Sequence, residues 1–89
     1  MEEKFLAAWE NNRAAANLMG VRMRPLDIKG AKRALSGSRL SDGFNLLAQK
    51  GRLDLSLEAL TVDRRFTGLF SDEEANEALM RLVEAGYRF

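Results

Sequence analysis

The stretch SDEEANEALMRLVEAGYRF, from Ser71 to Phe89, decides the fold of this chain because it contains a complete set of helix signals. Ser71, followed three residues later by Glu74, forms a capping box, in which the hydroxyl and the carboxylate each satisfy a free backbone N–H. The three acids of the first turn complement the positive end of the helix dipole. Gly86 stands where a left-handed residue ends a helix. We therefore predict a helix over residues 72–85.

The apolar residues of this stretch recur at helical spacing, which predicts one apolar face that needs a core to lie on. We expect the leucines of this face to be buried against the first segment of the chain, which is rich in alanine. Tyr87 is expected to fold back onto the last turn, as in a Schellman ending. Glu77 is well placed for an ion pair with Arg81. The apolar face consists of Ala75, Ala78, Leu79, Leu82 and Val83.

Length and composition indicate a single helical domain. The chain has 89 residues, which is long enough for one modest core and too short for two. Leucine and alanine are frequent whereas isoleucine and valine are scarce, and this favours helices over sheet. We predict an all-α domain over residues 1–89, folded as a compact bundle of four or five short helices.

Glycines divide the chain into segments with helical character. Five of the seven recur at intervals of fourteen to eighteen residues, and we interpret these five as helix terminators. We predict further helices over residues 2–19, after the cap Asp27, after the cap Ser41, and over residues 56–65 with Ser56 as the cap. The five glycines are Gly20, Gly37, Gly51, Gly68 and Gly86.

Two short stretches have extended character. Pro25 pushes the preceding residue out of the helical region, and Val21–Met23 alternates in a way that suits a short strand or a docked loop. Leu53–Leu55 also alternates, so it is ambiguous between a strand and the approach to the next helix. If both stretches are strands, Val21–Met23 and Leu53–Leu55 would pair as a minor two-stranded sheet.

The missing residue types limit the chemistry that the chain can perform. Without cysteine or histidine it has no thiolate, no disulfide, no ordinary zinc site and no histidine base. Nothing places a serine near a base or frames a pair of carboxylates. We therefore predict no catalytic residue, no metal and no cofactor, and a protein that is not an enzyme. A cleft lined by Asp54, Glu58 and Asp63 would contradict this prediction.

The N-terminal residues and the apolar runs bear on location. Met-Glu-Glu is unlike the basic start of a signal peptide. The longest unbroken apolar run, Phe5–Trp9, is too short to span a bilayer. We expect a soluble cytoplasmic protein with no membrane contact and no small-molecule substrate.

Charge is distributed unevenly along the chain. The net charge is +1, but residues 1–52 carry ten Lys or Arg against five Asp or Glu, whereas residues 53–89 carry four against eight. The basic excess lies between residues 22 and 39. The helix after Asp27, the glycine turn and the helix after Ser41 allow a helix-turn-helix interpretation. The candidate nucleic-acid contacts are Arg22, Arg24, Lys29, Lys32, Arg33 and Arg39.

Protein binding accounts for more of the sequence than nucleic-acid binding does. Asp42 stands where a recognition helix would meet a phosphate, and the near-neutral net charge is unlike that of a dedicated nucleic-acid binder. Large apolar residues near both termini favour a small accessory or regulatory module that binds another protein or a second copy of itself. Trp9 fits either a core residue or an exposed anchor. The candidate protein contacts are Phe5, Trp9, Tyr87 and Phe89.

Overall fold

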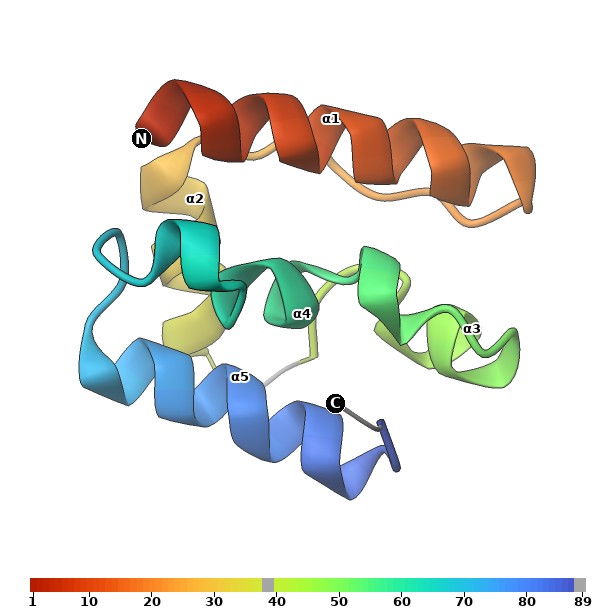
Figure 1. Cartoon of the computed structure of the whole chain (residues 1–89). Coiled ribbons are helices and arrows are strands. Elements are labelled where there is room, and N and C mark those ends of the chain that lie inside the picture. Colours follow the sequence, from red (N-terminus) through yellow and green to blue (C-terminus); the bar gives the residue numbers. More distant parts are fainter. Residues whose placement is uncertain (38–39, 88–89) are drawn as a thin grey trace.

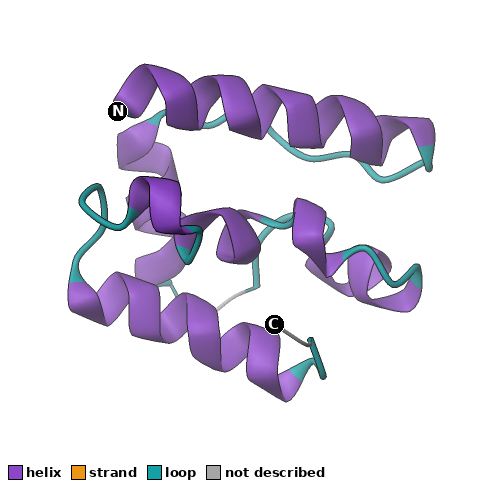
Figure 2. Cartoon of the chain, viewed as in Figure 1, coloured by secondary structure: helices purple, strands orange, loops and turns teal. Residues whose placement is uncertain are grey.

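Helices joined by short connections make up the computed structural model, which describes residues 1–37 and 40–87 (Figure 1). Within these residues the helices are α1 (Glu2–Leu18), α2 (Ile28–Ser36), α3 (Phe44–Gln49), α4 (Leu57–Thr61) and α5 (Asp72–Glu84), with 3-10 turns η1 (Leu53–Leu55) and η2 (Arg64–Phe66). No strand occurs in the described ranges (Figure 2). The prediction of a compact all-α bundle is therefore confirmed, and the predicted minor two-stranded sheet is wrong.

The short helix α4 lies at the centre of the molecule, with α1 on one side and α5 on the other (Figure 1). Four of the five residues of α4 are buried, and a helix that is covered on every side takes a central place. The prediction that the first and last helices pack together is therefore wrong, because α5 packs on α4 and α2 instead. Ala78 and Leu82 of α5 are buried as predicted, whereas Leu79 is 40% exposed.

Aromatic rings join α1 to the segment that precedes α5. Phe5 is fully buried and meets Phe66 and Phe70 edge to face, with 5.3 Å between the ring centroids in each pair. In this arrangement the positive edge of one ring meets the negative face of another, which adds to the free energy gained by burial. The three rings therefore attach the N-terminal half of α1 to the connection before α5.

Three of the five predicted helix terminators have the left-handed backbone that favours glycine. They are Gly20 (φ 82°), Gly51 (φ 70°) and Gly86 (φ 83°). At the end of α5 the N–H of Tyr87 donates to the carbonyl of Leu82, which makes a Schellman ending, as predicted. Gly37 also ends a helix, because it is the C-cap of α2, but its backbone is extended. Gly68 lies beyond η2, ends no α-helix and lacks the left-handed backbone, so its assignment as a terminator is wrong.

The connection between α1 and α2 is held by side chains of α1 rather than by a partner strand. The indole N–H of Trp9 donates to the carbonyl of Arg24 at 3.0 Å, and Nε of Arg13 donates to the carbonyl of Met23 at 2.8 Å. Val21 and Met23 are buried in the core. Because these carbonyls are paired with α1, the segment is a docked loop, which is one of its two predicted forms.

The helix α4 begins as predicted and ends early. The hydroxyl of Ser56 accepts from the N–H of Ala59 at the start of the helix, and the helix stops at Thr61 rather than near residue 65. Asp63 has an extended backbone, and its carboxylate accepts from the N–H of Arg65. This local cap starts the separate turn η2 and interrupts the longer helix that apolar spacing predicts.

The helix α3 begins later than predicted. It starts at Phe44, and the residue before it, Gly43, has a φ of 76° in the left-handed region. Ser41, the predicted cap, lies outside the helix, and its hydroxyl donates to a carboxylate oxygen of Glu58. The Ser41 hydroxyl therefore binds the buried carboxylate of Glu58 on α4 and does not cap α3.

Gly43→Ala is expected to destabilise the protein more than Gly51→Ala does. Both glycines have a left-handed backbone, which costs an alanine about 1–2 kcal/mol. A β-carbon at residue 43 would also lie 2.7 Å from Cγ1 of the buried Val21, whereas one at residue 51 would meet nothing within 4 Å. Overpacking of this kind adds about 1–3 kcal/mol. Urea denaturation of the two variants measures the difference, and equal losses would contradict it.

Candidate functional site

A buried ion pair fixes the orientation of α5. Nη1 of Arg81 lies 3.0 Å from Oε2 of Glu58, and only 5% and 0% of the two side chains are exposed. Two charges removed from water are tolerated when their other hydrogen-bonding groups are satisfied. Glu58 meets this condition because it also accepts from the hydroxyl and the backbone N–H of Ser41.

The remaining donors of Arg81 close the end of α2. Nη2 donates to the carbonyl of Gly37 at 2.9 Å, and longer contacts reach the carbonyls of Ala34 and Leu35. Nε donates to Glu77 at 2.8 Å, which confirms the predicted ion pair within α5. The guanidinium therefore satisfies the free carbonyls at the end of α2. At the ends of α1, α3 and α5 a left-handed glycine is present instead.

Large apolar side chains lie on the outer face of α5. Leu79, Met80 and Val83 are 40%, 56% and 60% exposed. Arg81 and Leu82 lie on other sides of the helix and are buried. The three exposed side chains therefore lie on the side of α5 that faces away from the core. Leu79 and Val83 are four residues apart and share one side of the helix. Single exposed apolar residues are common, but three on one face of a short helix make a patch.

A hollow adjoins this patch. It has a volume of about 400 Å³ and lies where α5 meets the end of α4 and the connection that follows. Leu79 belongs to both the patch and the hollow, so the two are continuous, and we call them together the α5 surface. The hollow is lined by Thr61, Val62, Thr67, Phe70, Asp72, Ala75, Asn76 and Leu79.

The α5 surface is acidic at its edges. Asp72, Glu73 and Glu84 are exposed, and their carboxylates have no ion pair within the described ranges. The one cation of α5, Arg81, is buried and already paired. Asp72 lines the hollow. Glu73, Met80 and Glu84 follow one another along one edge, because spacings of seven and four residues return to the same side of a helix.

Glu74 faces another side of α5 and belongs to the capping box. Its carboxylate accepts from the N–H of Ser71 at 2.7 Å, and the Ser71 hydroxyl accepts from the N–H of Glu74, as predicted. Nζ of Lys32 lies 3.0 Å from the same carboxylate. Burial by itself would raise the pKa of Glu74, but the hydrogen bonds from Ser71 and Lys32 outweigh it and lower that pKa.

Glu74→Gln is expected to reduce the acid sensitivity of folding. A carboxylate whose pKa is lowered in the folded state stabilises the protein above its unfolded-state pKa of about 4.3, and this contribution is lost as the pH falls through the folded-state pKa. The variant should therefore be less stable than the native protein by about 1 kcal/mol at about pH 7, and by nothing near about pH 2. Urea denaturation across this range measures the gap. Glu73→Gln, an exposed acid in the same turn, is the control, and a gap that does not change with pH would contradict the prediction.

The structure does not place Phe5 and Trp9 on the surface. Their exposed fractions are 0% and 2%, so they are core residues, and this corrects their prediction as contacts for a partner. The core interpretation of Trp9 is confirmed. Both rings project from the side of α1 that contacts α4 and its surroundings, where burial of a large ring gives the greatest gain. Tyr87 is partly buried against the core, and Phe89 lies outside the described residues.

Two of the six predicted nucleic-acid contacts are paired with carboxylates. Nε of Arg24 lies 2.9 Å from Oδ2 of Asp42, and Nζ of Lys32 is bound to Glu74. These two pairs neutralise part of the basic segment. Arg39 lies outside the described residues.

The other three candidates are exposed and differ in position. Arg22, Lys29 and Arg33 have no ion pair in the part of the chain that the structure describes. Lys29 and Arg33 are four residues apart and share one face of α2. Arg22 lies apart from them, beside a second hollow of about 410 Å³ between α1 and the connection that follows it.

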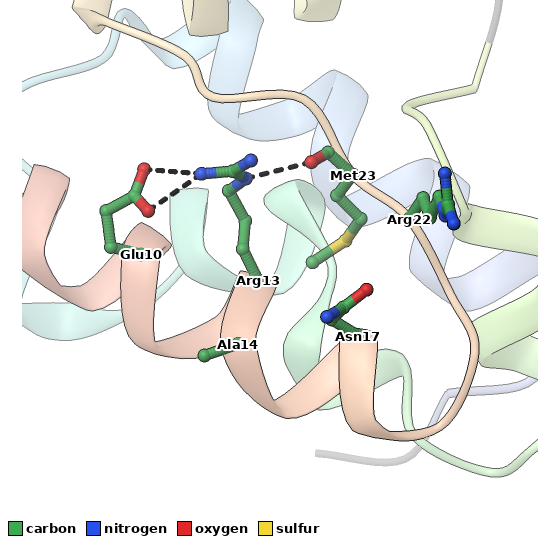
Figure 3. A pocket seen from close by; sticks show the side chains of 6 residues that line it. All are labelled: Glu10, Arg13, Ala14, Asn17, Arg22 and Met23. Carbon is green, nitrogen blue, oxygen red and sulfur yellow. Dashed lines mark hydrogen bonds and ion pairs between the residues drawn. The ribbon is translucent and has the colours of Figure 1, made fainter.

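This second hollow does not gather cations around one point (Figure 3). Arg13 is held by both carboxylate oxygens of Glu10, at 2.7 and 2.8 Å, and by the carbonyl of Met23. Arg22 lies on the far side of Met23 from Arg13 (Figure 3). The guanidinium of Arg13 therefore serves the packing of the connection, and it does not converge with Arg22 on a shared ligand.

The acids Asp54, Glu58 and Asp63 do not line a common cleft. Asp54 pairs with Arg52 and Asp63 pairs with Arg65, each with a residue two positions away, whereas Glu58 is buried. Within residues 1–37 and 40–87, no three acids gather in a way that could hold a metal ion.

Comparisons with known proteins do not assign a family or a function. No protein-family model, no curated protein and no solved structure matches this chain. The described helices include none with the length and apolar character needed to cross a membrane.

Proposed function

We propose that this protein is a small non-enzymatic module that binds another protein through the α5 surface. The observation that carries the proposal is the continuity of Leu79, Met80 and Val83 with the hollow beside α5. An exposed apolar patch on a small domain is typical of interfaces, and methionine adapts to partners of different shape. Burial of this patch in a complex would remove apolar area from water, which favours association.

The two buried charged groups, Glu58 and Arg81, serve the fold rather than catalysis. Glu58 and Arg81 bind each other, and their other polar atoms bind Ser41, Glu77 and the end of α2. A general acid or base must reach its substrate, and these two side chains face the interior.

The proposed function is tested by capture from a lysate of the native cells on the immobilised chain. We expect a partner that is retained by the native protein and by Leu18→Ser, and lost with Leu79→Ser/Val83→Ser. Leu18 is the matched control because it is 90% exposed and lies on α1. The partner must then form a complex of fixed stoichiometry with the purified chain. Equal capture by both variants, or no such complex, would overturn the proposal.

A second candidate function is nucleic-acid binding through α2, which the exposed pair Lys29 and Arg33 favours. Contacts to phosphate release counterions, so retention on heparin or DNA would fall steeply with salt. Lys29→Glu/Arg33→Glu should then elute at lower salt than Lys4→Glu/Lys50→Glu, which changes the net charge equally at exposed lysines elsewhere. Elution of the two variants at the same salt concentration would remove this candidate.

A further inference from the structure

The chemistry at the edges of the α5 surface indicates the charge of the partner. The exposed carboxylates of Glu73 and Glu84 lie along one edge of the apolar patch and that of Asp72 lies at the hollow, and α5 itself presents no exposed cation beside them. A partner with lysine or arginine next to its apolar residues would pair with these carboxylates across the interface. Electrostatic complementarity therefore favours a basic partner over a neutral or acidic one.

A second copy of the chain fits this surface less well. A two-fold dimer through the α5 surface would place the same patch against itself, so the acids of one copy would face the acids of the other. Like charges across an interface oppose association. A head-to-tail contact between α5 of one copy and α2 of the next would match in charge, but it would build rings or open chains rather than a two-fold dimer.

The shape of the α5 surface favours a helix as the bound element. Leu79 and Val83 form a row along α5, and the hollow adjoins this row. A helix packed against such a row inserts side chains that are three and four residues apart. An extended peptide would pair its backbone with an exposed strand edge, and residues 1–37 and 40–87 contain no strand.

We infer that the α5 surface binds a basic amphipathic helix of another protein. The apolar side chains of that helix cover Leu79, Met80 and Val83 and fill the hollow, and its lysine or arginine residues reach the carboxylates at the edges. This inference rests on the proposed function and adds the chemical class of the partner.

The inference is tested with a fluorescein-labelled helical peptide of leucine, alanine and lysine, whose leucines are three and four residues apart. A second peptide carries glutamate in place of lysine. Fluorescence anisotropy with the full chain, at low salt, should show the lysine peptide binding about ten-fold more tightly than the glutamate peptide. The ratio should shrink to about two-fold in about 1 M salt, because the Debye length then falls to about 3 Å.

Charge variants locate the effect on α5. Glu73→Gln/Glu84→Gln should weaken binding of the lysine peptide about five-fold. The two changes lie at opposite ends of α5, so their effects on the helix dipole oppose each other and the helix is preserved. The control Glu2→Gln/Glu3→Gln removes the same charge from exposed acids of α1 that have no ion pair among the described residues, and it should bind like the native protein.

Several results would overturn the inference. Equal affinity for the two peptides would remove the charge preference, and binding that survives in Leu79→Ser/Val83→Ser would place the peptide elsewhere. No binding of the lysine peptide, or a mass by light scattering that grows to a dimer or longer chains, would exclude a basic helix as the occupant. None of these results contradicts the proposed function if capture of a partner from the lysate still requires Leu79 and Val83. The experiments therefore test the proposed function and the class of the partner independently.

Discussion

Arg81→Met is expected to lower the free energy of unfolding by about 3–5 kcal/mol. Methionine keeps an apolar stem but removes the guanidinium, which leaves the carboxylate of Glu58 buried without its cation. The carbonyl of Gly37 at the end of α2 also loses its donor. Domains of this size have a total stability of about 5–15 kcal/mol, so the loss is a large fraction of the whole. Urea denaturation followed by circular dichroism measures it.

Two further variants separate the buried pair from ordinary surface charge. Arg52→Met removes a guanidinium whose ion pair with Asp54 is exposed on both sides, and exposed pairs contribute little, so we expect little change. Arg81→Met/Glu58→Met removes both buried charges and should recover part of the loss, because well-packed apolar residues can replace a buried pair. If Arg81→Met is as stable as Arg52→Met, the pair does not hold α5 in place.

Phe5→Ala is expected to cost about 3–5 kcal/mol as well, for a different reason. The ring of Phe5 is fully buried between Phe66 and Phe70, so its removal leaves a cavity and breaks two edge-to-face contacts. The loss should lower the midpoint of thermal unfolding by at least about 12 °C, since each kcal/mol shifts it by about 4–8 °C in a domain of this size. Thermal unfolding followed by circular dichroism gives the midpoint.

The matched variants for this prediction are Phe5→Leu and Leu18→Ala. Phe5→Leu keeps most of the buried volume but loses both ring contacts, so its loss should fall between those of Phe5→Ala and Leu18→Ala. Leu18 is 90% exposed, so Leu18→Ala should change stability by less than about 0.5 kcal/mol. A loss for Phe5→Ala no larger than that for Leu18→Ala would show that α1 is not attached through this ring.

Local signals in the sequence predict several helix ends correctly. The capping box of Ser71 and Glu74 is present, and the carboxylate of Asp27 accepts from the N–H of Gly30 at the start of α2. The Schellman ending at Gly86 is present too. Each of these depends on residues only a few positions apart, so the necessary groups are adjacent in the sequence whatever the rest of the chain does.

The arrangement of the helices depends on contacts that no local pattern contains. Arg81 reaches the carbonyl of Gly37, 44 positions earlier, and Glu58 accepts from Ser41, 17 positions earlier. Helical spacing shows that a segment has an apolar face, but it does not show which segment covers that face. The packing of α5 on α4 and α2, rather than on α1, therefore emerges only in three dimensions.

The α5 surface was only partly open to prediction. Met80 lies beside the predicted apolar face, so the apolar residues of this helix cover a wider sector than a core-facing stripe needs. This wider apolar sector is visible in the sequence. The hollow depends on how residues 61–70 meet α5, which the sequence does not show. Phe5 and Trp9 are misleading as surface candidates because large aromatic rings suit a core as well as an interface.

Trp9 is the only tryptophan of the chain, and its indole is buried and bonded to the carbonyl of Arg24. Its fluorescence therefore originates at a single location, the contact between α1 and the connection to α2. α4 separates α1 from α5 (Figure 1), so a helix bound on α5 leaves this indole in the same surroundings. The emission of Trp9 therefore reports on the fold alone. A red shift shows that the protein has unfolded, and an unchanged spectrum shows that the protein stays folded when a ligand binds α5.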